Sequence, residues 1–142
     1  MEADIILPNI TEACLLTDTE YKQSFDKAYI EKLISGLADI CPSKIVLTGV
    51  GFTDNTTGVA VFDGKSIEYY EHKKLGNGCH GTGDIYASAF VGAYMNGKNL
   101  FDAAKIAADY TVLCIENTIP HSEHWYGARF ETALGDLINM IK

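Results

Sequence analysis

Short aliphatic runs that alternate with a helical pattern are the feature that most constrains the fold of this chain. Residues Asp4–Pro8 and Lys44–Gly49 form two such runs, and each ends in turn-forming residues, as strands in the interior of a parallel sheet do. Between them, from Phe25 to Ala38, apolar residues recur at helical spacing and charged residues occupy the opposite face. The sequence therefore predicts an α/β fold in which this helix covers a sheet.

An antiparallel segment interrupts the α/β pattern. Residues Thr57–Phe62 and Lys65–Tyr70 are rich in strand-forming residues. The dipeptide Asp63-Gly64 joins them, and this dipeptide suits the positive φ angles of a two-residue hairpin loop. We expect a β-hairpin here.

The remaining residues predict three helices. The run Thr82–Asn96 is apolar nearly all round, which predicts a buried helix that Gly97 ends. A second helix begins near Leu100 and has one face of small and apolar residues, and a third covers about Ala128 to Met140. We find no repeat and no linker, so residues 1–142 are expected to form a single domain.

Charge and cysteine usage exclude several classes of function. The formal net charge of -8 opposes binding to nucleic acid and to anionic membrane surfaces. No apolar run reaches membrane-spanning length, and the first residues lack the basic region and apolar core of an export signal. The four cysteines are widely spaced without a C-x-x-C pair, as in a reduced protein. We therefore expect a cytoplasmic protein that handles any phosphate at a local site.

The strongest functional signal is Gly81-Thr82-Gly83-Asp84, a glycine turn that leads directly into the predicted buried helix. Free amides at a helix start, together with the helix dipole, form a site for phosphate. Asp84 would stand beside that phosphate as an acceptor for the proton of an attacking hydroxyl. The alternative is structural: Thr82 or Asp84 caps the helix, and the glycines only make a tight turn.

A second candidate is Asn9-Ile10-Thr11-Glu12, just past the end of the first predicted strand, where ligands gather in open α/β sheets. The amide oxygen of Asn9 and the carboxylate of Glu12 suit Mg²⁺ or the waters around it. An asparagine followed three residues later by glutamate also resembles a capping box, which needs no metal. On this pattern alone the capping box is the better interpretation.

Three further features are weaker. The hydroxyl of Thr48 and the amide of Gly49 end a strand where they could reach a phosphate, although this is also an ordinary strand-to-loop turn. His80 adjoins the glycine turn, and position is the only argument for its contacting phosphate. His121 and His124 lack a third ligand pattern for zinc, and Cys79 has no evident histidine–carboxylate partners for nucleophilic catalysis.

Taken in order, these motifs resemble the C-terminal half of the ribokinase-like kinases, and within them the pyridoxal and pyridoxamine kinases. The resemblance implies the C-terminal portion of a three-layer sandwich, with a mainly parallel sheet, an antiparallel hairpin and flanking helices. It also implies a role for each motif: Mg²⁺ positioning by Asn9 and Glu12, contact with ATP phosphate by Thr48 with Gly49, an anion hole from the amides of Gly81, Thr82 and Gly83, and proton abstraction by Asp84.

The activity implied is ATP-dependent phosphorylation of the hydroxymethyl group of pyridoxal, pyridoxamine or pyridoxine, by an enzyme that is a homodimer in the full-length family. Related hydroxymethylpyrimidine phosphate kinases typically carry cysteine at the position of Asp84, and sugar kinases usually carry alanine at that of Thr82. The helix from Leu100 to Asn117 would help to wall the adenine site. A different ribokinase-like kinase and a non-catalytic nucleotide-binding module remain the alternatives.

Members of this family are considerably longer than 142 residues. The half that supplies most of the substrate pocket and the first strands of the sheet has no counterpart here. A sheet cut at this point is expected to expose an unpaired edge and an apolar face.

Overall fold

The computed structural model describes residues 3–42, 44–76, 80–119 and 127–142. The chain divides into two compact units, Met1–Lys74 and Leu75–Lys142, and each is described by itself. In the described ranges no helix combines the length and the hydropathy needed to cross a membrane. The single-domain assignment stays a prediction.

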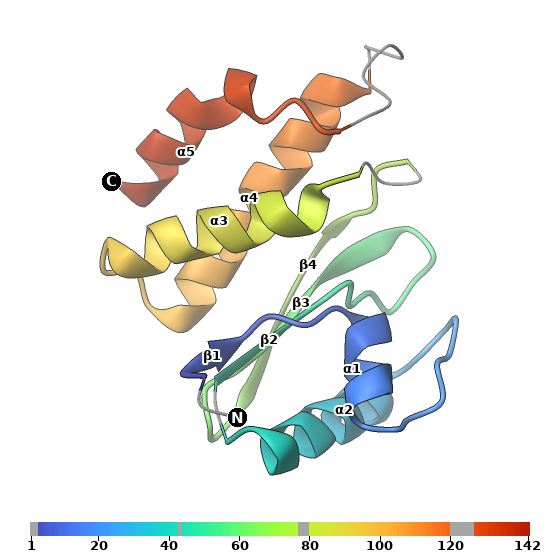
Figure 1. The fold of residues 1–142 in the computed structure, drawn as a ribbon. Helices are drawn as coiled ribbons and strands as arrows, with labels where there is room; N and C mark the ends of the chain where they lie inside the picture. Colours follow the sequence, from blue (N-terminus) through green and yellow to red (C-terminus); the bar gives the residue numbers. More distant parts are fainter. Residues whose placement is uncertain (1–2, 43, 77–79, 120–126) are drawn as a thin grey trace. The chain divides into compact units, whose positions relative to one another are not determined.

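The first unit is built on a sheet of four strands in the order β1-β2-β3-β4 (Figure 1). The strands are β1 (Ile5–Ile6), β2 (Lys44–Thr48), β3 (Thr56–Phe62) and β4 (Ile67–Lys73). β1 is much shorter than the predicted run because Pro8 has no N–H to donate to a ladder. Pairing resumes at a single parallel bridge between Asn9 and Thr48.

Parallel pairing is a smaller part of this sheet than the sequence predicts. β1 and β2 are parallel, whereas β2 pairs antiparallel with β3 and β3 antiparallel with β4. The α/β class is confirmed, but the described sheet is not mainly parallel. The cause is the predicted hairpin, which joins the sheet as two of its four strands instead of standing apart from it.

The hairpin loop is longer than predicted. Phe62 pairs with Ile67, so four residues, 63–66, form the connection and not two. The side chain of Asp63 accepts hydrogen bonds from the amides of Lys65 (2.8 Å) and Ser66 (2.9 Å), and Gly64 has a φ of 101°. These hydrogen bonds lower the pKa of the Asp63 carboxyl.

Two helices of this unit, α1 (Ile10–Leu16) and α2 (Lys27–Ile40), pack together against the sheet (Figure 1). α2 begins two residues later than predicted because Asp26 is its N-cap, with a side chain that accepts a hydrogen bond from the Tyr29 amide at 2.9 Å. The core between helices and sheet consists of apolar side chains from α1, α2, β2, β3 and the loop after β2: Ile10, Ala13, Cys14, Tyr29, Ile30, Leu33, Ile34, Leu37, Ile45, Leu47, Val50 and Ala60.

The second unit consists of α3 (Thr82–Met95), α4 (Leu100–Thr118), a short 3-10 helix η1 (Glu131–Ala133) and α5 (Leu134–Ile141). Gly97 ends α3 as predicted: its φ is 89°, and its amide donates to the Tyr94 carbonyl at 3.1 Å. The predicted third helix starts later than Ala128, because its first turn is the 3-10 helix.

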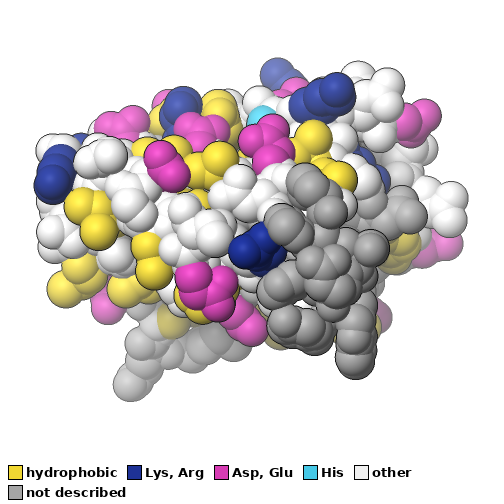
Figure 2. All heavy atoms as spheres, turned by 90° about the horizontal axis from the view of Figure 1, so that it is seen from above, with side chains coloured by type: hydrophobic (Ala, Val, Ile, Leu, Met, Phe, Trp, Pro, Cys, Tyr) yellow, Lys and Arg dark blue, Asp and Glu magenta, His cyan; other side chains and the backbone are white. Residues whose placement is uncertain are grey.

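One side of α3 is exposed, contrary to the prediction of a helix buried all round. Phe90 and Ala93 are buried, whereas Val91 is 54% and Met95 77% exposed. The prediction of a buried helix was therefore wrong for this side of α3, because its aliphatic residues are exposed. Figure 2 shows hydrophobic side chains lying among acidic and neutral ones on the molecular surface.

Candidate functional site

The predicted site residues fall into two groups, one in each unit. Asn9, Glu12, Thr48 and Gly49 belong to the unit Met1–Lys74, and the turn Gly81–Asp84 belongs to the unit Leu75–Lys142. The geometry within each group is described first, and the union of the groups in one active site is part of the proposal below.

Asn9 and Glu12 form the capping box at the start of α1. The Asn9 side-chain oxygen accepts a hydrogen bond from the Glu12 amide at 2.8 Å, and the Glu12 Oε2 atom accepts one from the Asn9 amide at 2.9 Å. The structural alternative is thus present. Because a carboxylate has about four acceptor positions, one bond through Oε2 leaves Glu12 able to bind a cation as well.

Asn9 lies beside Thr48, at adjacent ends of two parallel strands. The two residues form a parallel bridge, and both the amide (2.9 Å) and the hydroxyl (3.4 Å) of Thr48 donate to the Pro8 carbonyl. Gly49 follows with a φ of 79°, a left-handed conformation that favours glycine. The structure therefore brings the predicted metal and phosphate residues of this unit to the carboxyl ends of β1 and β2. Ligands of open α/β sheets bind at this end of the strands.

A magnesium ion in this unit would depend on few protein ligands. Within the described residues, no three His, Cys, Asp or Glu side chains gather as a metal-binding group. Mg²⁺ is usually held by one or two carboxylates, waters and substrate phosphates rather than by a cage of protein ligands. The exposed carboxylate of Glu12 fits that mode of binding, with the Asn9 amide group beside it.

The glycine turn of the second unit starts α3 without a side-chain cap. Gly81 is the N-cap, with a φ of 81°, and makes no side-chain cap hydrogen bond. Capping by Thr82 or Asp84, one part of the structural alternative, is therefore not what the described residues show, whereas the left-handed Gly81 fits its other part, a tight glycine turn. Within the described residues the amides of Thr82, Gly83 and Asp84 have no hydrogen-bond acceptor, so they are available to an anion.

The space around this turn is open. A Cβ atom added at Gly81 or at Gly83 would meet no described atom within 4 Å. Gly81 is required by its positive φ, whereas Gly83 is helical and needs no special backbone conformation. Asp84 is exposed in the first turn of α3, near the amides that would hold an anion.

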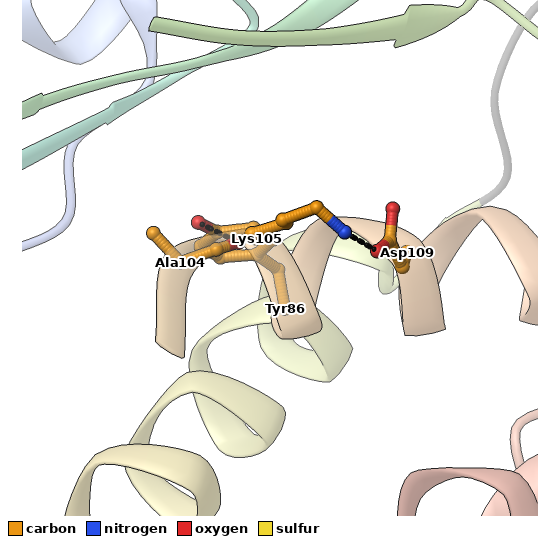
Figure 3. A network of polar contacts seen from close by, with 4 residues as sticks. All are labelled: Tyr86, Ala104, Lys105 and Asp109. Atoms are coloured by element: carbon orange, nitrogen blue, oxygen red, sulfur yellow. Dashed lines mark hydrogen bonds and ion pairs between the residues drawn. The ribbon is translucent and has the colours of Figure 1, made fainter. Parts of the chain in front are cut away.

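The start of α3 is fixed on α4 by a residue that the sequence analysis missed. The Tyr86 hydroxyl donates to the Ala104 carbonyl at 3.0 Å in a buried position, as Figure 3 shows. Burial raises the pKa of this phenol, so it stays protonated and remains a donor. The next residue of α4, Lys105, pairs with Asp109 one turn further along the helix at 2.8 Å. A tyrosine on an apolar helical face that needs a buried acceptor was the signal in the sequence.

The chain after residue 126 is held against α4 by two more polar contacts. Tyr110 donates through its hydroxyl to the Phe130 carbonyl at 2.9 Å, and the Thr118 hydroxyl accepts from the Arg129 amide at 2.7 Å. The residues predicted to line an adenine site lie in α4. Individual contacts between these residues and adenine stay unassigned. His80 is exposed, while Cys79, His121 and His124 lie outside the described residues.

Comparison with known proteins identifies similar kinases. The family model for phosphomethylpyrimidine kinase matches residues 1–128. A hydroxymethylpyrimidine/phosphomethylpyrimidine kinase of Aquifex aeolicus is 28% identical over 116 residues, which are 81% of this chain and 44% of that protein.

Comparison with solved structures also identifies kinases that are similar to this chain. The pyridoxal kinase of Lactobacillus plantarum matches with a TM-score of 0.84 and 26% identity, over 98% of this chain and 50% of its own. A candidate phosphomethylpyrimidine kinase of Bacteroides thetaiotaomicron, in a crystal form with pyridoxal, matches with a TM-score of 0.85 and 27% identity, over 96% of this chain and 49% of its own. The chain thus spans about half the length of these relatives, and the predicted resemblance is confirmed.

Proposed function

Because the chain belongs to the phosphomethylpyrimidine kinase family, we propose that it is the phosphate-binding half of an ATP-dependent kinase for the hydroxymethyl group of pyridoxal, pyridoxamine or pyridoxine. The uncapped start of α3 carries this proposal. Among the described residues, no acceptor bonds to its first-turn amides and no atom crowds its glycines, so this positive helix end is suited to a terminal phosphate.

In the proposed reaction Asp84 is the general base. Its carboxylate accepts the proton of the substrate hydroxyl as the oxygen attacks the γ-phosphorus of ATP. The bond between that phosphorus and the β–γ bridging oxygen breaks, and ADP leaves. The amides of Gly81, Thr82 and Gly83 stabilise the negative charge on the transferring phosphoryl group.

The residues of the first unit would serve the nucleotide. Thr48 and Gly49 contact its phosphates, and Asn9 and Glu12 hold Mg²⁺ directly or through water. When bound, the ion would neutralise charge on the nucleotide phosphates. This role requires the ends of β1 and β2 to face the start of α3 in the working enzyme.

Two observations bear on the acceptor. Aspartate at position 84 favours the pyridoxal kinases, because the similar hydroxymethylpyrimidine phosphate kinases typically carry cysteine there. The family model and the Aquifex relative favour hydroxymethylpyrimidine as a second candidate. Three cysteines of the described residues are buried and form no disulfide among the described residues, which supports a reducing, cytoplasmic setting. The complete enzyme is expected to be a homodimer, as the sequence resemblance implies.

A substrate panel tests the proposal. A complete enzyme, in which this chain is joined to the half that supplies most of the substrate pocket, is incubated with magnesium-ATP and pyridoxal, hydroxymethylpyrimidine or ribose, and both ADP release and the mass of the product are measured. We expect the highest kcat/KM with pyridoxal. A higher value with hydroxymethylpyrimidine would favour the second candidate. Nucleotide binding without turnover on any acceptor would identify a nucleotide-binding module instead.

A further inference from the structure

The loop of residues 49–55 leads from the proposed phosphate contacts at the end of β2 to the start of β3. Its first half is fixed by backbone packing. Val50 is fully buried, and its amide donates to the Gly58 carbonyl at 3.0 Å. A Cβ atom added at Gly51 would collide with the Thr56 carbonyl oxygen, so the backbone of the loop lies directly against β3.

The second half of this loop, whose residues 53–55 are exposed, is held by a carboxylate from β4. The Oε1 atom of Glu71 accepts hydrogen bonds from the Phe52 amide at 3.0 Å and from the Thr56 hydroxyl at 2.8 Å. The Thr56 hydroxyl in turn accepts from the Thr53 amide at 3.3 Å. Both ends of the exposed segment are therefore bound to one oxygen atom of Glu71.

Glu71 differs in this respect from Glu68, an exposed glutamate on the same strand. For Glu68 the structure shows no hydrogen bond within the described residues. Hydrogen bonds to an ionised acceptor are stronger than neutral ones, so Glu71 is suited to hold the loop. A second β4 residue supports it, since the Tyr69 ring packs edge-on against the Phe52 ring at 5.6 Å between centroids.

We propose that Glu71 is a positioning residue for nucleotide binding, which holds the loop of residues 49–55 in the conformation that presents Thr48 and Gly49 to a phosphate. This inference rests on the proposed function, in which these two residues contact ATP. Glu71 acts through the loop and not on the phosphate, because a carboxylate repels an anion. A loop that is already ordered loses less conformational entropy when its ligand binds.

The charge of Glu71 makes the effect of its loss distinctive. Removing a carboxylate from a chain with a net charge of -8 reduces the repulsion of an anion and by itself favours ATP binding. Losing the two hydrogen bonds instead frees the loop and weakens ATP binding. Because the two effects have opposite signs, a measurement of affinity separates them.

The test compares Glu71→Ala with Glu71→Gln in the complete enzyme. Both variants lose the charge, but glutamine keeps an oxygen acceptor for the Phe52 amide and the Thr56 hydroxyl. We expect Glu71→Ala to raise the Kd for magnesium-ATP about five-fold, which is the effect of roughly one hydrogen bond. Glu71→Gln and the matched control Glu68→Ala should leave this Kd unchanged or lower it. Calorimetry measures the Kd, and kcat at saturating ATP should stay within about two-fold in all three variants.

Thr56→Val tests the same contact from its other side, because it removes one of the two donors. It should also raise the Kd for magnesium-ATP, and the double variant with Glu71→Ala should raise it no further than Glu71→Ala alone. Backbone hydrogen exchange without nucleotide reports the contact itself. The Phe52 amide should exchange faster in Glu71→Ala than in Glu71→Gln, whereas the Val50 amide should exchange at the same rate in both.

An unaltered Kd in Glu71→Ala would overturn the inference, since the loop would then be free at no cost to nucleotide binding. An equal rise of the Kd in Glu71→Ala and Glu71→Gln would also overturn it, because the charge and not the hydrogen bonds would be responsible. Both outcomes leave the proposed kinase activity standing. A complete enzyme that binds no magnesium-ATP even with Glu71 in place would contradict the proposed function itself, and the role of Glu71 with it.

Discussion

At the residue scale, Asp84 differs from Asp102, another exposed carboxylate in the first turn of a helix of its unit, by its surroundings. It lies in the first turn of α3, whose N-cap Gly81 makes no side-chain hydrogen bond. By contrast, the Asn99 side chain accepts a hydrogen bond from the Asp102 amide at the start of α4. The amides near Asp84, which have no acceptor among the described residues, are what make it a candidate base and not only a helix-end carboxylate.

Replacing Asp84 with asparagine should lower kcat by about 10²- to 10⁴-fold, because this is the usual contribution of a general base. The Kd for magnesium-ATP should change little, since asparagine has nearly the same size and leaves the amides in place. Steady-state kinetics and calorimetry measure the two quantities. Asp136→Asn, at an exposed residue in the first turn of α5, is the matched control. Turnover that matches this control would remove the assignment of the base.

Glu12 has two possible roles, and two substitutions separate them. Glutamine can replace glutamate in a capping box, so Glu12→Gln should retain the melting temperature but raise the Mg²⁺ concentration needed for half-maximal activity. Glu12→Ala also removes the hydrogen bond to the Asn9 amide and should lower the free energy of unfolding by about 1 kcal/mol. Thermal unfolding and a magnesium titration measure both effects. An unchanged magnesium requirement in Glu12→Gln would leave only the structural role.

At the element scale, two glycines mark the start of α3, Gly81 as its N-cap and Gly83 in its first turn. The physical reason for glycine differs between these two positions. Gly81 needs its left-handed φ of 81°. Gly83 lies in the helix, and an added Cβ would meet no atom of the described residues within 4 Å. No contact among the described residues therefore requires glycine at position 83, whereas close approach of a phosphate would.

Gly83→Ala should accordingly stabilise the protein and weaken its nucleotide binding. Alanine in place of a helical glycine contributes about 0.5 to 1 kcal/mol to stability. The new methyl group would at the same time narrow the approach to the first-turn amides and raise the Kd for ATP at least several-fold. Chemical denaturation and calorimetry give the two numbers. Greater stability with unaltered affinity would show that no phosphate approaches this turn.

The elements themselves were predicted well where local chemistry defines them. The Gly97 stop, the run of β2 and the polar face of α2 follow from sequence periodicity and end signals. The hairpin loop was misjudged because the Asp63 side chain organises four residues, a contact that the dipeptide alone does not reveal. The exposed side of α3 could not be foreseen, since aliphatic residues such as Met95 give no sign of what covers them.

At the scale of the whole molecule, sequence reasoning reached the α/β class but not the balance of pairing in the sheet, and the site residues stay a prediction. Strand direction depends on which strands become neighbours, and that is a long-range property. The two groups of site residues lie in the two separate units, so the proposal that they act in one active site also belongs to this scale. The anchoring of α3 by Tyr86 was missed for the same reason, because Ala104 is 18 residues away.

The Pro8 carbonyl accepts from both the amide and the hydroxyl of Thr48, and the next residue is already the N-cap of α1. The connection between the sheet and α1 therefore contains no spare residue. An inserted residue would change the position and rotation of α1 relative to β2. A substituted side chain would leave both unchanged. Among natural relatives, insertions and deletions should thus be rarer at this crossing than substitutions.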